Sequence, residues 1–139
     1  MKTKKLKYIP DFNFILIGVS STDDDYKFSW QISELLVLEF GRCKDLEIID
    51  PRFSEFLLFS TYETINTTDD KRIRIISNKG KEGFLIDELK NIDFFVMIYD
   101  FENIDFVDSL IGKLKSLNSI SAVFKIDPVT LKSREKLLF

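Results

Sequence analysis

Two nearly uninterrupted apolar segments constrain the fold of this chain more than any other feature. Residues 12–20 (FNFILIGVS) and 92–99 (IDFFVMIY) are rich in β-branched and aromatic residues and carry almost no charge. Segments of this length and composition are typical of interior strands that are covered on both faces. The chain has 139 residues, which is enough for one hydrophobic core and too few for two, so we expect a single domain, 1–139.

A helical pattern follows each of the two predicted interior strands. The sequence STDDD at 21–25 has the spacing of a capping box and predicts a helix from there to about Phe40, with Gly41 as its C-terminal cap. A second helix is predicted over residues 103–117. Its apolar residues fall at i, i+3, i+4 and i+7, at Val107, Leu110, Ile111 and Leu114.

The remaining segments predict further strands. We expect a strand at 53–62, a strand at 71–77 that pairs with it, a turn at 78–83, a short strand at 84–86, a helical turn at 87–91 and a last strand at 120–126. The order β-α-β-β-β-α-β predicts an α+β fold. We expect a two-layer sandwich with a mixed or antiparallel sheet of about five strands and two main helices, a variant of the ferredoxin-like arrangement. The predicted core contains Phe14, Leu16, Ile32, Leu36, Phe95, Met97, Leu110 and Leu114.

The composition excludes several classes of chemistry. The chain contains no histidine and a single cysteine, Cys43, so histidine bases, histidine metal ligands, an intrachain disulfide and a cysteine-based zinc site are all unavailable. Cys43 is predicted to be a small buried thiol. The carboxylates at 23–25 and at 100–108 are predicted to stabilise helix N-termini rather than to bind a metal. We therefore assign no cofactor, no metal ligand and no catalytic residue.

Charge and hydropathy bear on partners and location. The formal net charge of −3 disfavours a dedicated nucleic-acid binder, although lysines crowd residues 1–8 and basic residues recur over 71–81. No apolar run approaches the roughly 20 residues of a membrane-spanning helix, and no signal-peptide core follows the basic start. We expect a cytoplasmic protein with no membrane partner and with residues 1–8 as a loosely ordered lead-in.

The end of the chain is unusually apolar for a terminus. Residues 129–139 follow Pro128, are predicted to form a tail or short helix, and end in Leu-Leu-Phe. An uncovered apolar end is typical of an interaction site. Either these side chains dock on the core of their own domain, which we favour, or they insert into a partner or a second copy.

One segment resembles a family signature. In residues 84–98 (FLIDELKNIDFFVMI), Ile86, Glu88 and Asp93 match the pattern of the IPExxxDY family, while Asp87 stands in place of its proline and Phe94 in place of its tyrosine. Residues 11–21, DYKFSW at 25–30, ISNKG at 76–80 and the end of the chain are also similar to that family. The resemblance implies a small bacterial cytoplasmic protein and no particular activity.

We expect a small non-enzymatic interaction module that binds a protein partner or forms a homodimer. The alternative is an accessory RNA- or ribonucleoprotein-binding protein that uses the basic residues of 71–81 and the basic termini, and a carboxylate-dependent enzyme is the least favoured hypothesis. Tyr8, Tyr26 and Trp30 are the aromatic residues best suited to anchor an interface, although each is predicted to lie in the core or at its edge. The residues selected as a partner-binding surface are Glu88, Asp93, Lys132, Arg134, Leu137, Leu138 and Phe139.

Overall fold

The structure, a computed structural model, describes residues 13–50, 55–65, 72–99 and 104–138. The strands are β1 (Phe14–Ser21), β2 (Glu39–Arg42), β3 (Leu46–Asp50), β4 (Glu55–Phe59), β5 (Thr61–Ile65), β6 (Arg72–Ser77), β7 (Phe94–Tyr99) and β8 (Ile120–Ile126). The helices are α1 (Asp25–Leu36) and α2 (Ile104–Lys115), with 3-10 turns η2 (Asp87–Leu89), η3 (Pro128–Thr130) and η4 (Arg134–Leu137).

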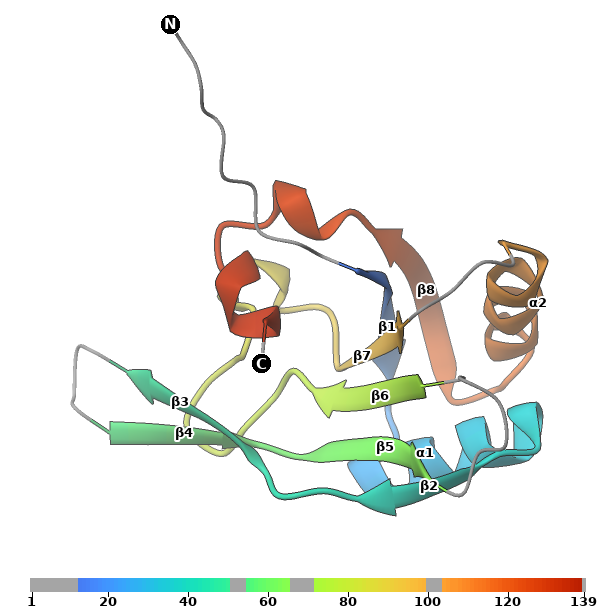
Figure 1. Cartoon of the computed structure of the whole chain (residues 1–139), viewed down its shortest axis with the longest axis horizontal. Helices are drawn as coiled ribbons and strands as arrows, with labels where there is room; N and C mark the ends of the chain where they lie inside the picture. Colours follow the sequence, from blue (N-terminus) through green and yellow to red (C-terminus); the bar gives the residue numbers. More distant parts are fainter. Residues whose placement is uncertain (1–12, 51–54, 66–71, 100–103, 139) are drawn as a thin grey trace, which may run out of the picture.

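Six of these strands form one antiparallel sheet in the order β2-β5-β6-β7-β1-β8 (Figure 1). The two apolar segments lie at its centre, where Gly18 of β1 pairs with Phe95 of β7 on one side and with Phe124 of β8 on the other. The strands β8-β1-β7-β6 and the two helices have the ferredoxin-like order, and β5 and β2 extend the β6 edge. The predicted α+β class is confirmed, with six strands in the main sheet.

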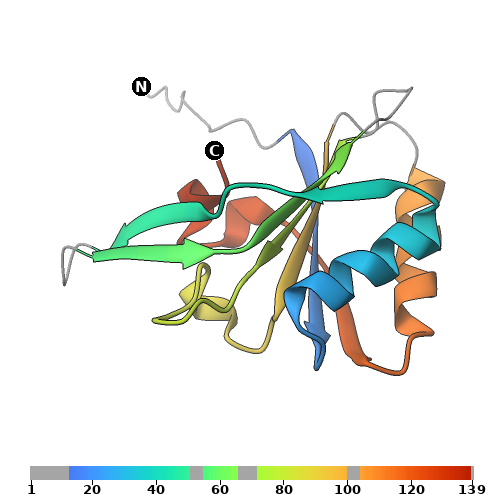
Figure 2. The ribbon, with the colours of Figure 1, turned by 90° about the horizontal axis from the view of Figure 1, so that it is seen from below.

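The two strands β3 and β4 form a separate two-stranded sheet. In the chain β3 follows β2 and β4 precedes β5, so the four strands make one long hairpin that bends at residues 43–45 and at Ser60. At the bend the backbone N–H of Cys43 donates to the carbonyl of Thr61 at 2.9 Å. Figures 1 and 2 show β3 and β4 extending beyond the end of the main sheet.

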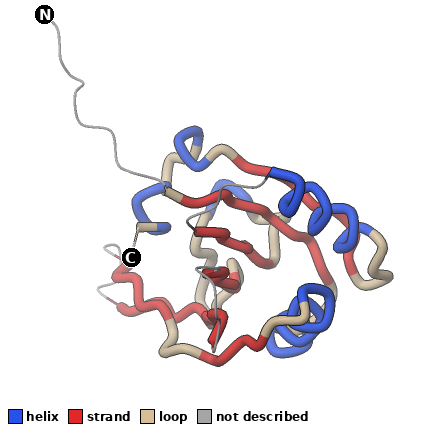
Figure 3. The backbone as a smooth tube through the Cα atoms, turned by 45° about the vertical axis from the view of Figure 1, so that its right-hand side comes forward, coloured by secondary structure: helices blue, strands red, loops and turns tan. Residues whose placement is uncertain are grey.

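Both long helices cover the same face of the main sheet (Figure 3). Phe28 and Ile32 of α1 and Val107 and Leu110 of α2 are buried against the side chains of β1, β6 and β7 that point to this face. The ring of Phe28 stacks on that of Phe94 with their centroids 4.3 Å apart. This layer is the helix side of the predicted sandwich.

The opposite face of the sheet has its own apolar core, which we call the second core. Phe95 and Met97 of β7 and Leu16 of β1 pack there against residues 84–92, the C-terminal segment and the inner side of the β3–β4 hairpin. Gly18 leaves room on this face, since a side-chain carbon at its position would lie 2.7 Å from Ile126 Cδ1. Short irregular segments therefore cover the face that carries no helix.

The first helix differs from the prediction at both ends. Its N-terminal cap is Asp24, whose carboxylate accepts the N–H of Lys27 at 3.2 Å, rather than a residue at the start of 21–25. The helix ends at Leu36, not near Phe40, and its C-terminal cap is Val37 with a positive φ of 53°. The residues that follow pair with β5 as β2, so strand pairing overrides the helical pattern there and places Gly41 inside a strand.

The middle strands differ from the prediction as well. The segment predicted as one strand at 53–62 is interrupted at Ser60, because β4 pairs with β3 whereas β5 pairs with β2 and β6. Phe84 forms a single bridge to Lys79 in place of the predicted strand at 84–86. Of the predicted core residues, only Leu36 is partly exposed and the others are buried. The predicted lead-in at 1–8 lies outside the described residues.

Candidate functional site

The outer side of the β3–β4 hairpin carries large apolar residues that face solvent. Ile49 and Phe56 are paired directly across the two strands, and each is 61% exposed. Leu58, 50% exposed, lies two residues from Phe56 on the same side and is paired with Glu47. The three residues thus form one continuous cluster, which we call the hairpin face.

The hairpin is apolar on both sides. The alternate residues Leu46, Ile48 and Leu57 pack on the second core, and Phe59 is buried there. A two-stranded sheet normally buries one apolar side and presents a polar side to water. The exposed side therefore requires an explanation other than folding of the described residues.

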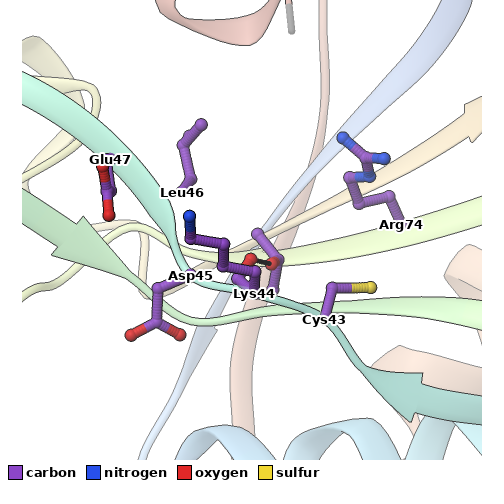
Figure 4. Close-up of a pocket in the computed structure, with 7 residues that line it drawn as sticks. Cys43, Lys44, Asp45, Leu46, Glu47 and Arg74 are labelled. Atoms are coloured by element: carbon purple, nitrogen blue, oxygen red, sulfur yellow. Dashed lines mark hydrogen bonds between the residues drawn. The ribbon is translucent and has the colours of Figure 1, made fainter.

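A pocket of about 320 Å³ lies at the bend of the hairpin, beside the hairpin face. Figure 4 shows the side chains around it, which come from the bend and from β3, β5 and β6: Cys43, Lys44, Asp45, Leu46, Glu47, Thr61 and Arg74. The Asp45 carboxylate binds the Arg42 guanidinium at 2.7 Å, and the Thr61 hydroxyl donates to the Lys44 carbonyl at 2.8 Å.

Cys43 is predicted to be a small buried thiol, but it is only partly buried and lines this pocket. Burial and the nearby Glu63 carboxylate raise the pKa of its thiol, against an opposing effect of Arg74. The thiol therefore stays protonated at neutral pH. Because the thiolate is the nucleophilic form, the pocket does not present an activated cysteine.

A cluster of charged side chains on β5 and β6 lies next to this pocket. The Glu63 carboxylate accepts from Arg72 Nε and, at 3.0 Å, from Arg74 Nη2, and the Arg72 guanidinium lies 4.2 Å from the ring centroid of Tyr99. Burial alone favours a raised pKa, but the two arginines lower the pKa of Glu63 below its ordinary value. Both arginines of the basic stretch 71–81 are thus bound within the chain.

Two of the predicted site residues, Glu88 and Asp93, bind other segments of the same chain. The Glu88 carboxylate accepts the backbone N–H and the hydroxyl of Ser133 at 3.0 and 2.9 Å, which joins the segment after β6 to the C-terminal segment. Burial by itself would raise the pKa of Glu88, but the hydrogen bonds that its carboxylate accepts outweigh this effect and lower the pKa. Asp93 accepts the backbone N–H of Ser21 at 2.7 Å and binds Lys79 at 2.5 Å.

The predicted residues of the tail do not form one surface. Leu137 is 1% exposed and lies in the second core, whereas Leu138 is 40% exposed. Arg134 donates from Nη1 to the Leu131 carbonyl at 3.1 Å, and Lys132 is exposed. Phe139 lies outside the described residues. The structure brings Glu88 to the tail through Ser133, whereas Asp93, directly before β7, binds Ser21 at the end of β1.

The predicted aromatic anchors on α1 are exposed rather than packed in the core or at its edge. Tyr26 is 66% and Trp30 60% exposed, one helical turn apart. The charged residues Lys27 and Glu34 lie beside them and are also exposed. Val37, the C-terminal cap of α1, is exposed as well. The hairpin face differs from this surface because its apolar residues pair directly across two strands and adjoin a pocket. Tyr8 lies outside the described residues.

Sequence reasoning missed the hairpin face. One signal was present: in EFLLF at 55–59, apolar residues occupy both alternating positions, as they do in LEII at 46–49 except for Glu47. The pattern at 53–62 predicts a single strand that pairs with 71–77, and no strand is predicted at 46–49. The sequence does not reveal that one face of these segments has no covering element among the described residues.

Comparison with protein-family models and with curated proteins gives no match for this chain. Within the described ranges no helix combines the length and the apolar character that crossing a bilayer requires. The described acidic residues and cysteine likewise form no group of three or more that could hold a metal ion. The hairpin face and the adjoining pocket are therefore the candidate site on geometry alone.

Proposed function

We propose that this protein is a small cytoplasmic interaction module that binds a partner protein through the hairpin face. The observation that carries the proposal is the solvent exposure of Ile49, Phe56 and Leu58 as one cross-strand cluster. Apolar clusters of this kind on a surface mark interaction sites, and burying large apolar side chains drives most protein association.

The RNA-binding alternative has weaker support. Arg72 and Arg74 share the carboxylate of Glu63, and Lys79 binds Asp93, so these basic side chains are partly neutralised inside the chain. Nucleic-acid binding depends on cations that are available to phosphates. An enzymatic role is supported still less, because burial raises the pKa of the Cys43 thiol in the pocket and keeps it protonated.

The proposed kinship to the IPExxxDY family fits an interaction protein. Ile86 is fully buried, and Glu88 and Asp93 bind Ser133 and Ser21 respectively. The residues that carry the resemblance thus have structural duties here.

The proposal is tested by affinity capture with tagged full-length chains. We expect Phe56→Ser to remove a partner that the unmodified chain retains from native lysate, since serine deletes the largest side chain of the hairpin face. The matched control is Trp30→Ser, which removes a similarly exposed aromatic residue from α1 and should leave capture unchanged.

Circular dichroism of both variants checks that the fold is intact. Loss of the partner in Trp30→Ser but not in Phe56→Ser would move the interface to α1 and contradict the proposal. Retention of the same partner by both variants would contradict it as well.

A further inference from the structure

The β3 strand offers an open backbone edge beside the hairpin face. It pairs with β4 along Leu46–Asp50, and no strand in the described ranges pairs with its other side. The backbone edge of β4 that faces away from β3 is not open in the same way, because the turn at 78–83 lies close to it. A side-chain carbon at Gly80 would lie 2.8 Å from the Leu58 carbonyl oxygen. The unpaired N–H and C=O groups of an edge strand are a template for another strand.

The charges of the hairpin strands are mostly negative, although the exposed Lys44 at the bend lies beside the same pocket as Glu47 and Arg74 in that pocket binds Glu63. Glu47 is exposed on the same side of β3 as Ile49 and forms no ion pair with any described residue, whereas Asp45 at the bend binds Arg42. In the sequence of the hairpin, residues 46–59, three carboxylates accompany a single arginine. The edge therefore combines an apolar position with an uncompensated negative position.

We propose that the β3 edge binds an extended segment of a separate protein in which Lys or Arg lies two residues from a large apolar residue. Residues at i and i+2 of an added strand point to the same side of the sheet. One therefore lies beside Glu47 and the other beside Ile49, where opposite charges and apolar side chains form stabilising cross-strand pairs. This inference rests on the proposed function and specifies the chemistry of the partner.

Charge also argues against a second copy as the occupant. Pairing β3 with β3 of another molecule would bring together two hairpins that each carry an excess of carboxylates. Like charges placed together across an interface oppose association. The N-terminal residues 1–12 of this chain are basic and partly apolar and are a further alternative, which the experiment below distinguishes.

The experiment is an NMR titration of the full-length, isotope-labelled chain with synthetic peptides. The probe is the nine-residue peptide TKTLTKTLT, and its matched control is TETLTETLT. We expect the lysine peptide to shift the amide signals of Leu46–Asp50 and to bind at least tenfold more tightly than the glutamate peptide. The affinity should fall as salt is raised, because charge attraction contributes to it.

Variants of equal net charge separate the site from the overall acidity of the chain. Glu47→Lys should weaken binding of the lysine peptide at least tenfold. Glu34→Lys makes the same change in net charge on an exposed position of α1 and should leave binding unchanged. Equal weakening by both variants would show non-specific attraction and overturn the proposal.

Three further outcomes would also overturn it. The first is the absence of shifts at 46–50 with the lysine peptide. The second is a dimer, detected by light scattering, that Glu47→Lys alters. The third is tighter peptide binding when the N-terminal lysines are replaced in the full chain (Lys4→Gln, Lys5→Gln and Lys7→Gln), which would identify residues 1–12 as the occupant. If Phe56→Ser removes the captured partner while the peptide does not bind, the proposed function stands and only this chemistry fails.

Discussion

At the residue scale, Asn78 shows how one buried polar side chain organises an irregular segment. Its side-chain amide donates to the carbonyls of Leu89 and Ile92, each at 2.9 Å, and its Oδ1 accepts the N–H of Ile86 at 2.7 Å. Asn78 is fully buried. A buried polar group is stable only when its hydrogen bonds are made, and here all of them hold the segment that covers the second core.

Asn78→Ala is expected to destabilise the protein by at least about 2 kcal/mol, because two buried backbone groups and the partly buried Leu89 carbonyl lose their partner. The measurement is the free energy of unfolding in urea. Asn91→Ala, in the same segment but exposed, is the control and should change stability little. Similar losses in the two variants would show that the hydrogen bonds of Asn78 are not the cause.

The lowered pKa of Glu63 predicts how the stability of the folded chain depends on pH. The native pKa of Glu63 is lowered, so the unfolded chain binds its proton more readily than the folded chain does. Its stabilising contribution is complete above the ordinary carboxyl pKa of about 4.3 and is lost as pH falls through the lower native value. Glu63→Gln should therefore be less stable than the unmodified chain at pH 6, and the difference should shrink below about pH 4.

Thermal melts of both proteins between pH 6 and pH 3 measure this difference. A gap in melting temperature that stays constant over the whole range would contradict the assignment. The interpretation requires that Arg72 and Arg74 keep their charges, as guanidinium groups do throughout this range.

At the scale of elements, the C-terminal segment is part of the core. Leu137 in η4 is buried among the residues of the second core, while its neighbour Leu138 is half-exposed. The bond between Glu88 and Ser133 joins this segment to the chain before β7. Two 3-10 turns thus cover a sheet face that in many α+β proteins is open to water.

Leu137→Ala is expected to cost roughly 2–5 kcal/mol, through lost burial and the cavity left behind. Leu138→Ala is the matched control in the same turn and should cost well under half of that. Urea denaturation of the two variants is the measurement. A negligible loss for Leu137→Ala would show that the tail does not contribute to folding of the isolated chain.

The elements also show why the sequence predicted some strands and missed others. β1, β7 and β8 are long runs whose apolar content identifies them locally, and the i, i+3, i+4, i+7 pattern identifies α2. The residues of β2 continue the helical pattern of α1, and they become a strand only because β5 pairs with them. Pairing between distant segments is not encoded in a local pattern.

At the scale of the whole molecule, the long hairpin links the fold to the candidate site. Its base completes the main sheet as β2 and β5, and its tip leaves the sheet as β3 and β4 (Figure 1). The base is held by the sheet, and the inner side of the tip is held by the second core. The hairpin face therefore lies on a pair of strands that the rest of the molecule holds in place.

The α+β class, the two central strands and both helices could be predicted from the sequence, as could the exclusion of histidine chemistry and of an intrachain disulfide. These follow from composition and from short-range periodicity, which depend on neighbouring residues alone. Three features became visible only in the three-dimensional arrangement: Glu88 and Asp93 make hydrogen bonds within the chain, Trp30 is exposed, and Ile49, Phe56 and Leu58 share an uncovered face. Burial depends on which distant segment lies over a residue, and an apolar side chain has the same local pattern whether it is covered or not.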